Sequence, residues 1–240
     1  MLTRTRPLVE VAVDSVASAV MAAGLGADRL ELCQDLELGG TTPSLGLLEA
    51  VLERVSIPVV VMIRPRPGDF AYGPDDFRVM EADIWHAVRA GATGVVVGPL
   101  TAQATIDREG LKRLVDCAEL ATVTFHRAFD LVAGSIEGLA VLVEEGVARL
   151  LTAGGGATAD AGRAAIGRLV KQAGDSLAVM AGGGVTAEHV AALVEATGVR
   201  EIHLSGIALR PAGVGGFGMT TVPNPDRLRR IMAALNSPSL

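Results

Sequence analysis

Ionisable side chains interrupt several short apolar segments of this chain, and these are the residues that could carry chemistry. Burying a charged or polar side chain is costly unless the group is paired, so each such position needs a physical reason. The candidates are Glu10, Glu31, Arg64, His126, Arg127, Asp130, His203 and Ser205. Glu10 and Glu31 could form an acid–base pair beside Arg64 as an anion-binding guanidinium. The alternative is a salt-bridge network that only fills space.

His126 follows an apolar segment and, unlike most side chains, can carry a proton near neutral pH. Asp130 could fix the tautomer of His126 or cap the next helix, and Arg127 could bind an anion or pair with Asp130. His203 lies in the middle of its apolar segment, and we expect a hydrogen-bonded core histidine there rather than a ligand.

Glycine-bearing turns follow the last two apolar segments, at Gly182, Gly183 and Gly184 and again at Ser205 and Gly206. In such turns, backbone N–H groups and a nearby helix N-terminus can hold phosphate. Glycine is also the usual residue of a tight turn. The sequence therefore predicts an anion-binding seat here, with a plain turn as the alternative.

Short apolar, β-branched segments alternate with helical stretches along the whole chain. Eight segments are expected to be strands: Leu8–Val13, Arg29–Cys33, Val59–Arg64, Gly94–Gly98, Thr122–His126, Arg149–Thr152, Ala178–Gly182 and Glu201–Ser205. Continuously apolar runs of this length are typical of parallel strands that are covered on both faces. Four glycines can end the helices between them in the left-handed conformation: Gly26, Gly91, Gly146 and Gly198.

This alternation predicts an α/β fold, a single (β/α)8 TIM-type barrel. We expect one domain over residues 1–240, with the barrel at about 8–210 and a Gly/Pro-rich segment and final helix at 211–240. A doubly wound sheet is the alternative, but Asp14-Ser15-Val16 is not a dinucleotide fingerprint.

A barrel would bring the candidate residues together, because the carboxyl ends of all its strands meet at one face. Glu10, Glu31, Arg64 and His126 would then share a rim. The loop at 65–76, which contains Phe70, is expected to be either a lid over that rim or an oligomer contact.

Composition excludes some classes of partner. The chain has 21 Lys and Arg against 27 Asp and Glu, a net charge of −6, so it lacks the basic footprint of a nucleic-acid-binding protein. No apolar run reaches the ~20 residues of a membrane helix. Glu10 and Asp14 interrupt the only stretch that resembles a signal peptide. We expect a cytoplasmic protein without nucleic-acid or membrane partners.

Several longer motifs together resemble the CutC family, from about Leu8 to Ser205. They are Leu30–Cys33, Gly39–Gly46, Ile63–Tyr72, Thr122–Asp130, Leu151–Gly154 and Met180–Val185. The resemblance implies a cytosolic TIM-type barrel that forms homo-oligomers and is associated with copper homeostasis, with copper attributed to cysteines.

The cysteine pattern departs from that family. Relatives often carry a Cys-Cys pair at the end of the first strand, where this chain has Ala12 and Val13. Cu(I) prefers two or more soft ligands. Cys33 is the one cysteine expected near the rim, so it is the candidate metal ligand, with Met62 or His126 as its nearest additional donors.

Three functional hypotheses remain open at this point. The first is a copper-binding protein that uses Cys33. The second is an enzyme acting on a small anionic metabolite, with or without a phosphate group, with Glu10 or Glu31 as base, His126 as acid and Arg64 as anion clamp. The third is a barrel without a site. No cofactor other than copper is expected.

Overall fold

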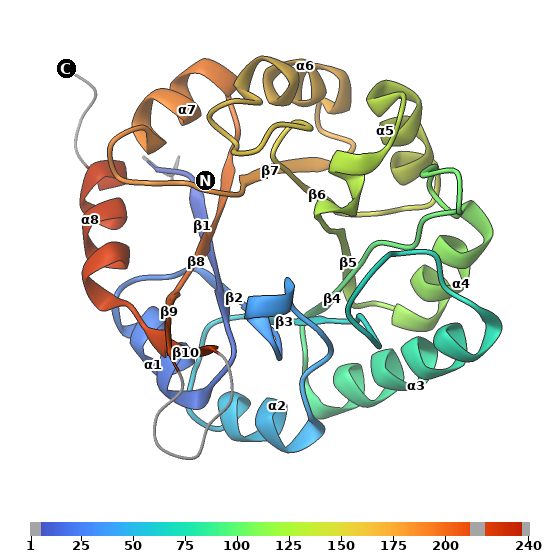
Figure 1. Ribbon diagram of the computed structural model, residues 1–240, viewed down its shortest axis with the longest axis horizontal. Coiled ribbons are helices and arrows are strands. Elements are labelled where there is room, and N and C mark those ends of the chain that lie inside the picture. Colours follow the sequence, from blue (N-terminus) through green and yellow to red (C-terminus); the bar gives the residue numbers. More distant parts are fainter. Residues whose placement is uncertain (1–5, 212–218, 237–240) are drawn as a thin grey trace.

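A computed structural model of the chain describes residues 6–211 and 219–236. Eight parallel strands close into a barrel in chain order, with the last strand paired to the first, which confirms the predicted fold (Figure 1). The strands are β1 (Leu8–Val13), β2 (Arg29–Leu32), β3 (Val59–Met62), β4 (Gly94–Val97), β5 (Thr122–Phe125), β6 (Arg149–Thr152), β7 (Ala178–Gly182) and β8 (Glu201–Ser205).

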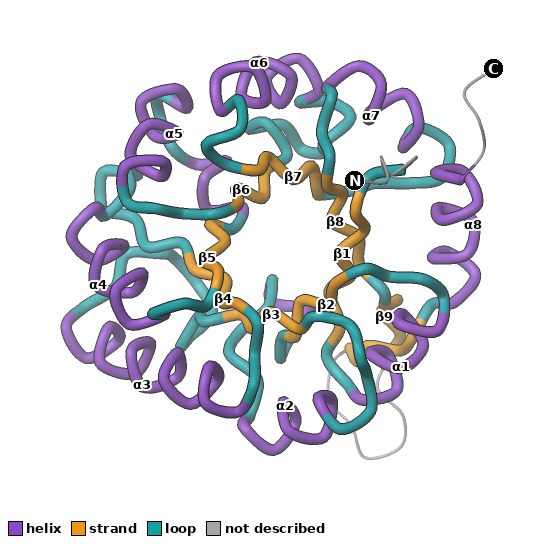
Figure 2. Tube along the Cα trace, turned by 180° about the vertical axis from the view of Figure 1, so that it is seen from behind, coloured by secondary structure: helices purple, strands orange, loops and turns teal. Residues whose placement is uncertain are grey.

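Helices form a ring around the strands, as the view from behind in Figure 2 also shows. The helices are α1 (Val16–Gly24), α2 (Leu45–Leu52), α3 (Pro74–Ala90), α4 (Arg108–Ala118), α5 (Ser135–Glu144), α6 (Arg163–Ala173), α7 (Val190–Thr197) and α8 (Pro225–Asn236). Short 3-10 helices η1 (Leu36–Leu38) and η2 (Arg127–Leu131) follow β2 and β5.

The C-terminal segment completes this ring. After β8 the chain forms an antiparallel hairpin of β9 (Ile207–Pro211) and β10 (Met219–Pro223). Helix α8 then packs against both α7 and α1. The segment expected to follow the barrel therefore supplies its last helix. Residues 212–218 of the Gly/Pro-rich part lie outside the described residues.

The alternation of side chains along each strand decides what faces the barrel interior. Val9, Val11 and Val13 of β1 join the main apolar core between strands and helices. Glu10 points the other way and contacts side chains from other strands inside the barrel. This is the period of two expected for a strand. The main apolar core therefore lies outside the barrel wall, and the interior is partly polar.

Several predicted element ends shift by one or two residues. Strands β2 to β5 end earlier than expected, so Cys33, Arg64 and His126 lie just beyond their strands. The glycines expected after helices do adopt left-handed backbone, with φ of 91° at Gly26 and 110° at Gly91. In the described part of the chain, no helix has the length and apolar character needed to cross a membrane.

Candidate functional site

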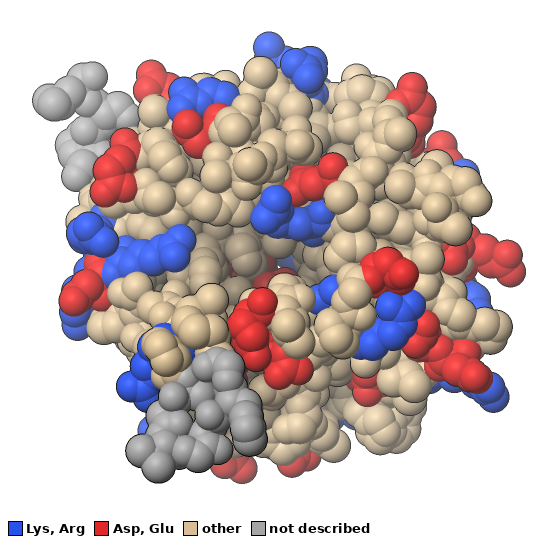
Figure 3. All heavy atoms as spheres, viewed as in Figure 1, with Lys and Arg blue, Asp and Glu red and all other residues tan. Residues whose placement is uncertain are grey.

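A cavity of about 240 Å³ opens at the carboxyl ends of the strands. The space-filling view in Figure 3 shows this face hollowed near its centre, with acidic and basic side chains around the hollow. The cavity is lined by Ala12, Glu31, Leu36, Gly39, Met62, Arg64, Phe70, His126, Arg127, Ala128, Leu151, His203, Ser205 and Ile207. Most of its wall is thus apolar, with a few ionisable groups, as is usual for small-molecule sites.

Glu31 and His203 form the acidic side of the cavity. His203 Nε2 lies 3.7 Å from Glu31 Oε2, and its Nδ1 lies 2.9 Å from Glu10 Oε1. Glu31 Oε1 is buried and has no hydrogen-bond partner in the described structure. Glu10 is fully buried and does not line the cavity. Glu31 is therefore the carboxylate that a ligand can reach, and Glu10 supports it through His203.

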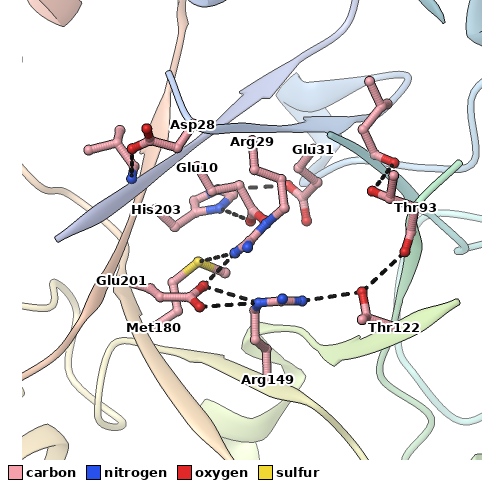
Figure 4. A network of polar contacts seen from close by, with 12 residues as sticks. Glu10, Asp28, Arg29, Glu31, Thr93, Thr122, Arg149, Met180, Glu201 and His203 are labelled. Atoms are coloured by element: carbon pink, nitrogen blue, oxygen red, sulfur yellow. Dashed lines mark hydrogen bonds and ion pairs between the residues drawn. The ribbon is translucent and has the colours of Figure 1, made fainter. Parts of the chain in front are cut away.

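A second layer of charges lies beneath this cluster (Figure 4). Arg29 donates hydrogen bonds to Glu10 and to Glu201. Arg149 pairs with Glu201 at 3.1 Å, and Arg29 Nη2 lies 3.6 Å from Met180 Sδ. The partner of Glu10 is thus Arg29, whereas the sequence hypothesis placed Arg64 beside the two carboxylates.

These contacts change the pKa values of the cluster. Burial alone raises the pKa of Glu10, but the hydrogen bond from His203 and the charge of Arg29 lower it to about 2. Burial raises the pKa of Glu31, and the Glu10 carboxylate adds to this effect against the opposing charge of His203. Burial lowers the pKa of His203, but its two carboxylate neighbours raise it above the ordinary value. The protonation of Glu31 and that of His203 therefore depend on each other.

Arg64 is a buried cation on the opposite wall. Its side chain is held by backbone carbonyls of two loops, those of Leu38, Gly40 and Gly68, at 2.8–3.0 Å. In the described part of the chain it has no carboxylate partner, and its buried Nε has no hydrogen-bond partner. A buried guanidinium without a counter-charge is costly. Its position in the cavity wall favours an anionic ligand.

His126 is neutral in this environment. Its Nδ1 accepts a hydrogen bond from the Ala128 N–H at 3.1 Å, so the ring proton lies on Nε2, which is buried without a partner. Burial, and then the charge of Arg64, lowers its pKa to about 3. The expectation that this ring carries a charge near neutral pH is therefore not met. His126 can instead donate a hydrogen bond into the cavity.

The loop after β3 packs on its own barrel and lines the cavity. The Phe70 ring lies 5.0 Å from the ring of His126 and 5.0 Å from the Arg64 guanidinium carbon. The Leu100 N–H donates to the Phe70 carbonyl at 2.8 Å, which ties the loop to the neighbouring one. The loop, expected to be a lid or an oligomer contact, therefore forms part of the cavity wall.

Asp130 does not contact His126 by any hydrogen bond in the described structure. Its carboxylate accepts from Thr152 Oγ1 and from the amides of Ala153 and Gly155. It also pairs with Arg127, whose side chain is exposed at the cavity rim. Asp130 therefore holds the loop after β6 in place and neutralises Arg127.

The glycine turns lie mostly outside the cavity. Gly182 packs against Leu151 and His203, and Gly183 lies against the Arg127 guanidinium. Gly184 lies against Thr158. None of the three lines the cavity. Ser205 does line it, but the Gly206 N–H donates to the Ala12 carbonyl at 3.1 Å.

Cys33 is buried in a small cluster inside the barrel with Met62. Its Sγ lies 3.6 Å from Glu31 Oε2. Burial, and then the Glu31 carboxylate, raises the pKa of this thiol well above its ordinary value. The second cysteine, Cys117, is half-buried on α4 in the outer ring. The two thiols therefore do not form a pair, and Cys33 is a neutral thiol.

A second set of potential metal ligands is the cluster of Glu10, Glu31 and His203, whose donor atoms all lie within 4.8 Å of one another. Oxygen and imidazole donors suit harder cations than Cu(I). Glu10 is already bound by Arg29 and His203. The residues present therefore do not fit the thiolate copper site that the family resemblance implies.

His203 was a sequence candidate, expected as a hydrogen-bonded core histidine; it does bond to Glu10, but it also lines the cavity. Three other residues of these layers were not among the candidates: Arg29, Arg149 and Glu201. Each of them opens or continues a strand, where a charge is unusual. Arg29 and Glu31 are two positions apart, as are Glu201 and His203. Since alternate strand residues share a face, this spacing places each pair on the side of Glu10 and Glu31. That signal could have identified Arg29 and Glu201.

Comparisons with known proteins agree on one family. The CutC family profile matches residues 7–208. A CutC family protein from Histophilus somni is 43% identical over 216 residues, which cover 90% of this chain and 89% of the relative. The human copper homeostasis protein cutC homolog is 46% identical over 207 residues, 86% of this chain and 76% of the human protein. The crystal structure of CutC from Streptococcus agalactiae has a TM-score of 0.79 and 34% identity, and the match covers 82% of this chain and 98% of that one.

Proposed function

This chain belongs to the CutC family, and we propose that the mouth of its barrel binds a small anionic metabolite and transfers a proton on it. The proposal includes a cytoplasmic location and a homo-oligomeric state, which the family resemblance supports. The cavity wall supplies one cation, one neutral hydrogen-bond donor and one carboxylate–imidazole pair for this purpose.

One observation carries the proposal. Three buried polar atoms without a partner, Glu31 Oε1, Arg64 Nε and His126 Nε2, belong to residues that line the same cavity. Leaving a buried donor or acceptor unsatisfied costs about 1–3 kcal/mol each. Native proteins keep few such groups, and water or a ligand usually completes them. A ligand with an anionic group, a second acceptor and a proton to lose would satisfy all three.

The chemistry follows from the charge states. Arg64 would hold the anionic group, and the Glu31 carboxylate would accept a proton from the ligand. His126, as a neutral ring, would donate its Nε2–H to the ligand oxygen on which negative charge develops. His203, 3.7 Å from Glu31, would stabilise the Glu31 carboxylate when its own ring is protonated. Glu31 then returns the proton to the ligand.

Proton exchange with solvent tests this proposal. The protein is incubated in D₂O with a panel of small carboxylates and phosphate esters, and NMR follows deuterium uptake into each compound. We expect at least one compound to exchange, and Glu31→Gln to abolish the exchange. Glu37→Gln removes an exposed carboxylate of η1 and is the matched control. The proposal fails if no compound takes up deuterium and none raises the thermal stability of the protein.

Copper homeostasis, which the name of the human relative states, is the second candidate. One observation favours this candidate: Cys33 and Met62 lie on the same side of Gly40. A Cβ atom added to Gly40 would lie 3.4 Å from Cys33 Sγ and 3.6 Å from Met62 Cε. Sulfur donors suit Cu(I), but a neutral thiol and one thioether make a weak site.

A Cu(I) titration separates the two candidates. The parent and Cys33→Ser are titrated against a competing chelator, and bound metal is quantified. We expect equal and weak uptake by both. Tight uptake of one equivalent by the parent alone would establish Cys33 as a copper ligand.

A further inference from the structure

We infer that the ligand of this cavity is a small 2-oxo monocarboxylic acid, bound by its carboxylate to Arg64, rather than a phosphorylated compound. This inference rests on the proposed function and names its substrate class. Four features of the described structure support it: the donors left on Arg64, the charge of the wall, the surroundings of the backbone amides after β6 to β8, and the placement of His126 and Glu31.

The first feature is the number of free donors on Arg64. Three of its five N–H groups donate to loop carbonyl oxygens. The Nε–H and one Nη2–H remain, and Nε is buried without a partner. Two N–H groups of one guanidinium match the two oxygens of a carboxylate. The packed Phe70 ring and the carbonyl contacts fix the guanidinium, so it is organised before a ligand arrives.

The second feature is the charge of the cavity wall. The described lining residues include two arginines, and Asp130 neutralises Arg127. His203 is balanced by its carboxylate neighbours. Arg64 therefore contributes a single uncompensated positive charge. A carboxylate balances it with one negative charge. A phosphate dianion would bring a second negative charge close to Glu31, in a buried site where unpaired charge is costly.

The third feature is the state of the amides that could hold phosphate. After β6, the amides of Ala153 and Gly155 donate to Asp130, so this carboxylate occupies the position a phosphate would take. After β8, the Gly206 N–H is bonded to Ala12, and the chain enters β9 rather than a helix. After β7, side chains of Arg127 and Thr158 lie against Gly183 and Gly184.

The fourth feature is the arrangement of the remaining groups around a small volume. A cavity of about 240 Å³ equals the space of about eight water molecules at ~30 Å³ each, which suits a short acid. The Phe70 ring contacts both Arg64 and His126, so all three residues share one part of the cavity wall. With the carboxylate on Arg64, the neighbouring 2-oxo oxygen can accept from His126 Nε2–H.

The proton transfer then has a defined course. The C3–H bond of the 2-oxo acid breaks, and its proton passes to the Glu31 carboxylate. The electron pair forms the C2–C3 double bond, while the carbonyl electrons move to the C2 oxygen that His126 stabilises. The reverse step returns a proton from Glu31 to C3. In D₂O the returned proton is a deuteron, so deuterium accumulates at C3.

Calorimetry and NMR on the full chain test this inference with pyruvate, propionate and inorganic phosphate. We expect saturable pyruvate binding that phosphate does not displace, and weaker binding of propionate because it lacks the 2-oxo group. Arg64→Gln, and Arg64→Lys as the charge-preserving variant, should each weaken pyruvate binding about tenfold or more, since both lose the planar pair of donors. Arg78→Gln on the exposed face of α3 is the control.

The possible results separate this inference from the proposed function. Phosphate that displaces pyruvate, or Arg64 variants that bind pyruvate like the parent, would overturn the carboxylate assignment. If phosphate esters bind and exchange protons, the proposed function stands without it. If pyruvate binds through Arg64 but C3 gains no deuterium above the uncatalysed rate, the carboxylate assignment stands and the proton transfer fails.

Discussion

Glu10→Gln tests the energetic role of the charged layer beneath the cavity. The substitution keeps the size of the side chain but removes the charge that faces Arg29 and His203. Glu10 is fully buried, with a relative exposure of 0%. Removing one partner of a buried ion pair leaves the other charge uncompensated, which typically costs about 3–5 kcal/mol.

The pKa of Glu10 gives a second route to the same magnitude. Lowering this pKa from 4.5 to about 2 corresponds to about 3 kcal/mol of stabilisation, since a shift of one pKa unit is worth about 1.4 kcal/mol. Because the folded-state pKa lies below the unfolded value, this stabilisation is complete above about pH 5 and is lost as the pH falls through the folded value. By pH 3 less than half of it remains.

Urea unfolding followed by circular dichroism measures this effect. We expect Glu10→Gln to lower the free energy of unfolding by about 3 kcal/mol at pH 7 and by less than half of that at pH 3. Glu49→Gln, an exposed carboxylate on α2, is the control and should change little. A loss below about 1 kcal/mol at pH 7, or an equal loss at both pH values, would refute the reasoning.

Three further predictions follow from neighbouring contacts. NMR titration should show the His126 ring neutral from pH 5 to 8 with its proton on Nε2, since its pKa is about 3; a midpoint near 6.5 would contradict this. Gly98→Ala should lower the free energy of unfolding, measured by thermal unfolding, by about 1–3 kcal/mol, because the added Cβ would lie 2.0 Å from His126 Cε1. Gly46→Ala, in open space on α2, is the control and should raise it by about 0.5–1 kcal/mol. Asp130→Asn should speed hydrogen exchange at the Gly155 amide, which donates to that carboxylate; unchanged protection there would argue against the hydrogen bond.

The barrel could be predicted from the sequence because its strands are short, apolar and regularly spaced. Each expected strand is present, with small errors at the ends, as where β3 stops at Met62 rather than Arg64. The hairpin of β9 and β10 was not predicted. Strand ends depend on where neighbouring strands stop pairing, and this depends on register rather than on local residue type. For the same reason the sequence could not show that α8 closes the ring between α7 and α1.

The site was only partly predictable. Glu31, Arg64 and His126 do line one cavity, as expected from their positions at strand ends. The pairing of Glu10 could not be predicted. Its partner Arg29 lies nineteen residues away in the sequence, and the two meet because the β1–β2 register places them directly opposite each other. Likewise, the neutral state of His126 depends on burial and on Arg64, and neither follows from its place in the sequence.

The contrast between the two charged layers shows where the function of this barrel lies. In the lower layer, Arg29 and Arg149 share Glu201, and Glu10 has a donor on each oxygen. Such a closed network can be explained by structure alone. In the upper layer, Glu31, Arg64 and His126 each keep a buried atom unpaired around the same space. Packing alone would have favoured apolar side chains there, since unpaired polar groups destabilise a core. The unpaired groups are therefore best explained by a ligand, for which the lower layer holds His203 and Glu31 in position.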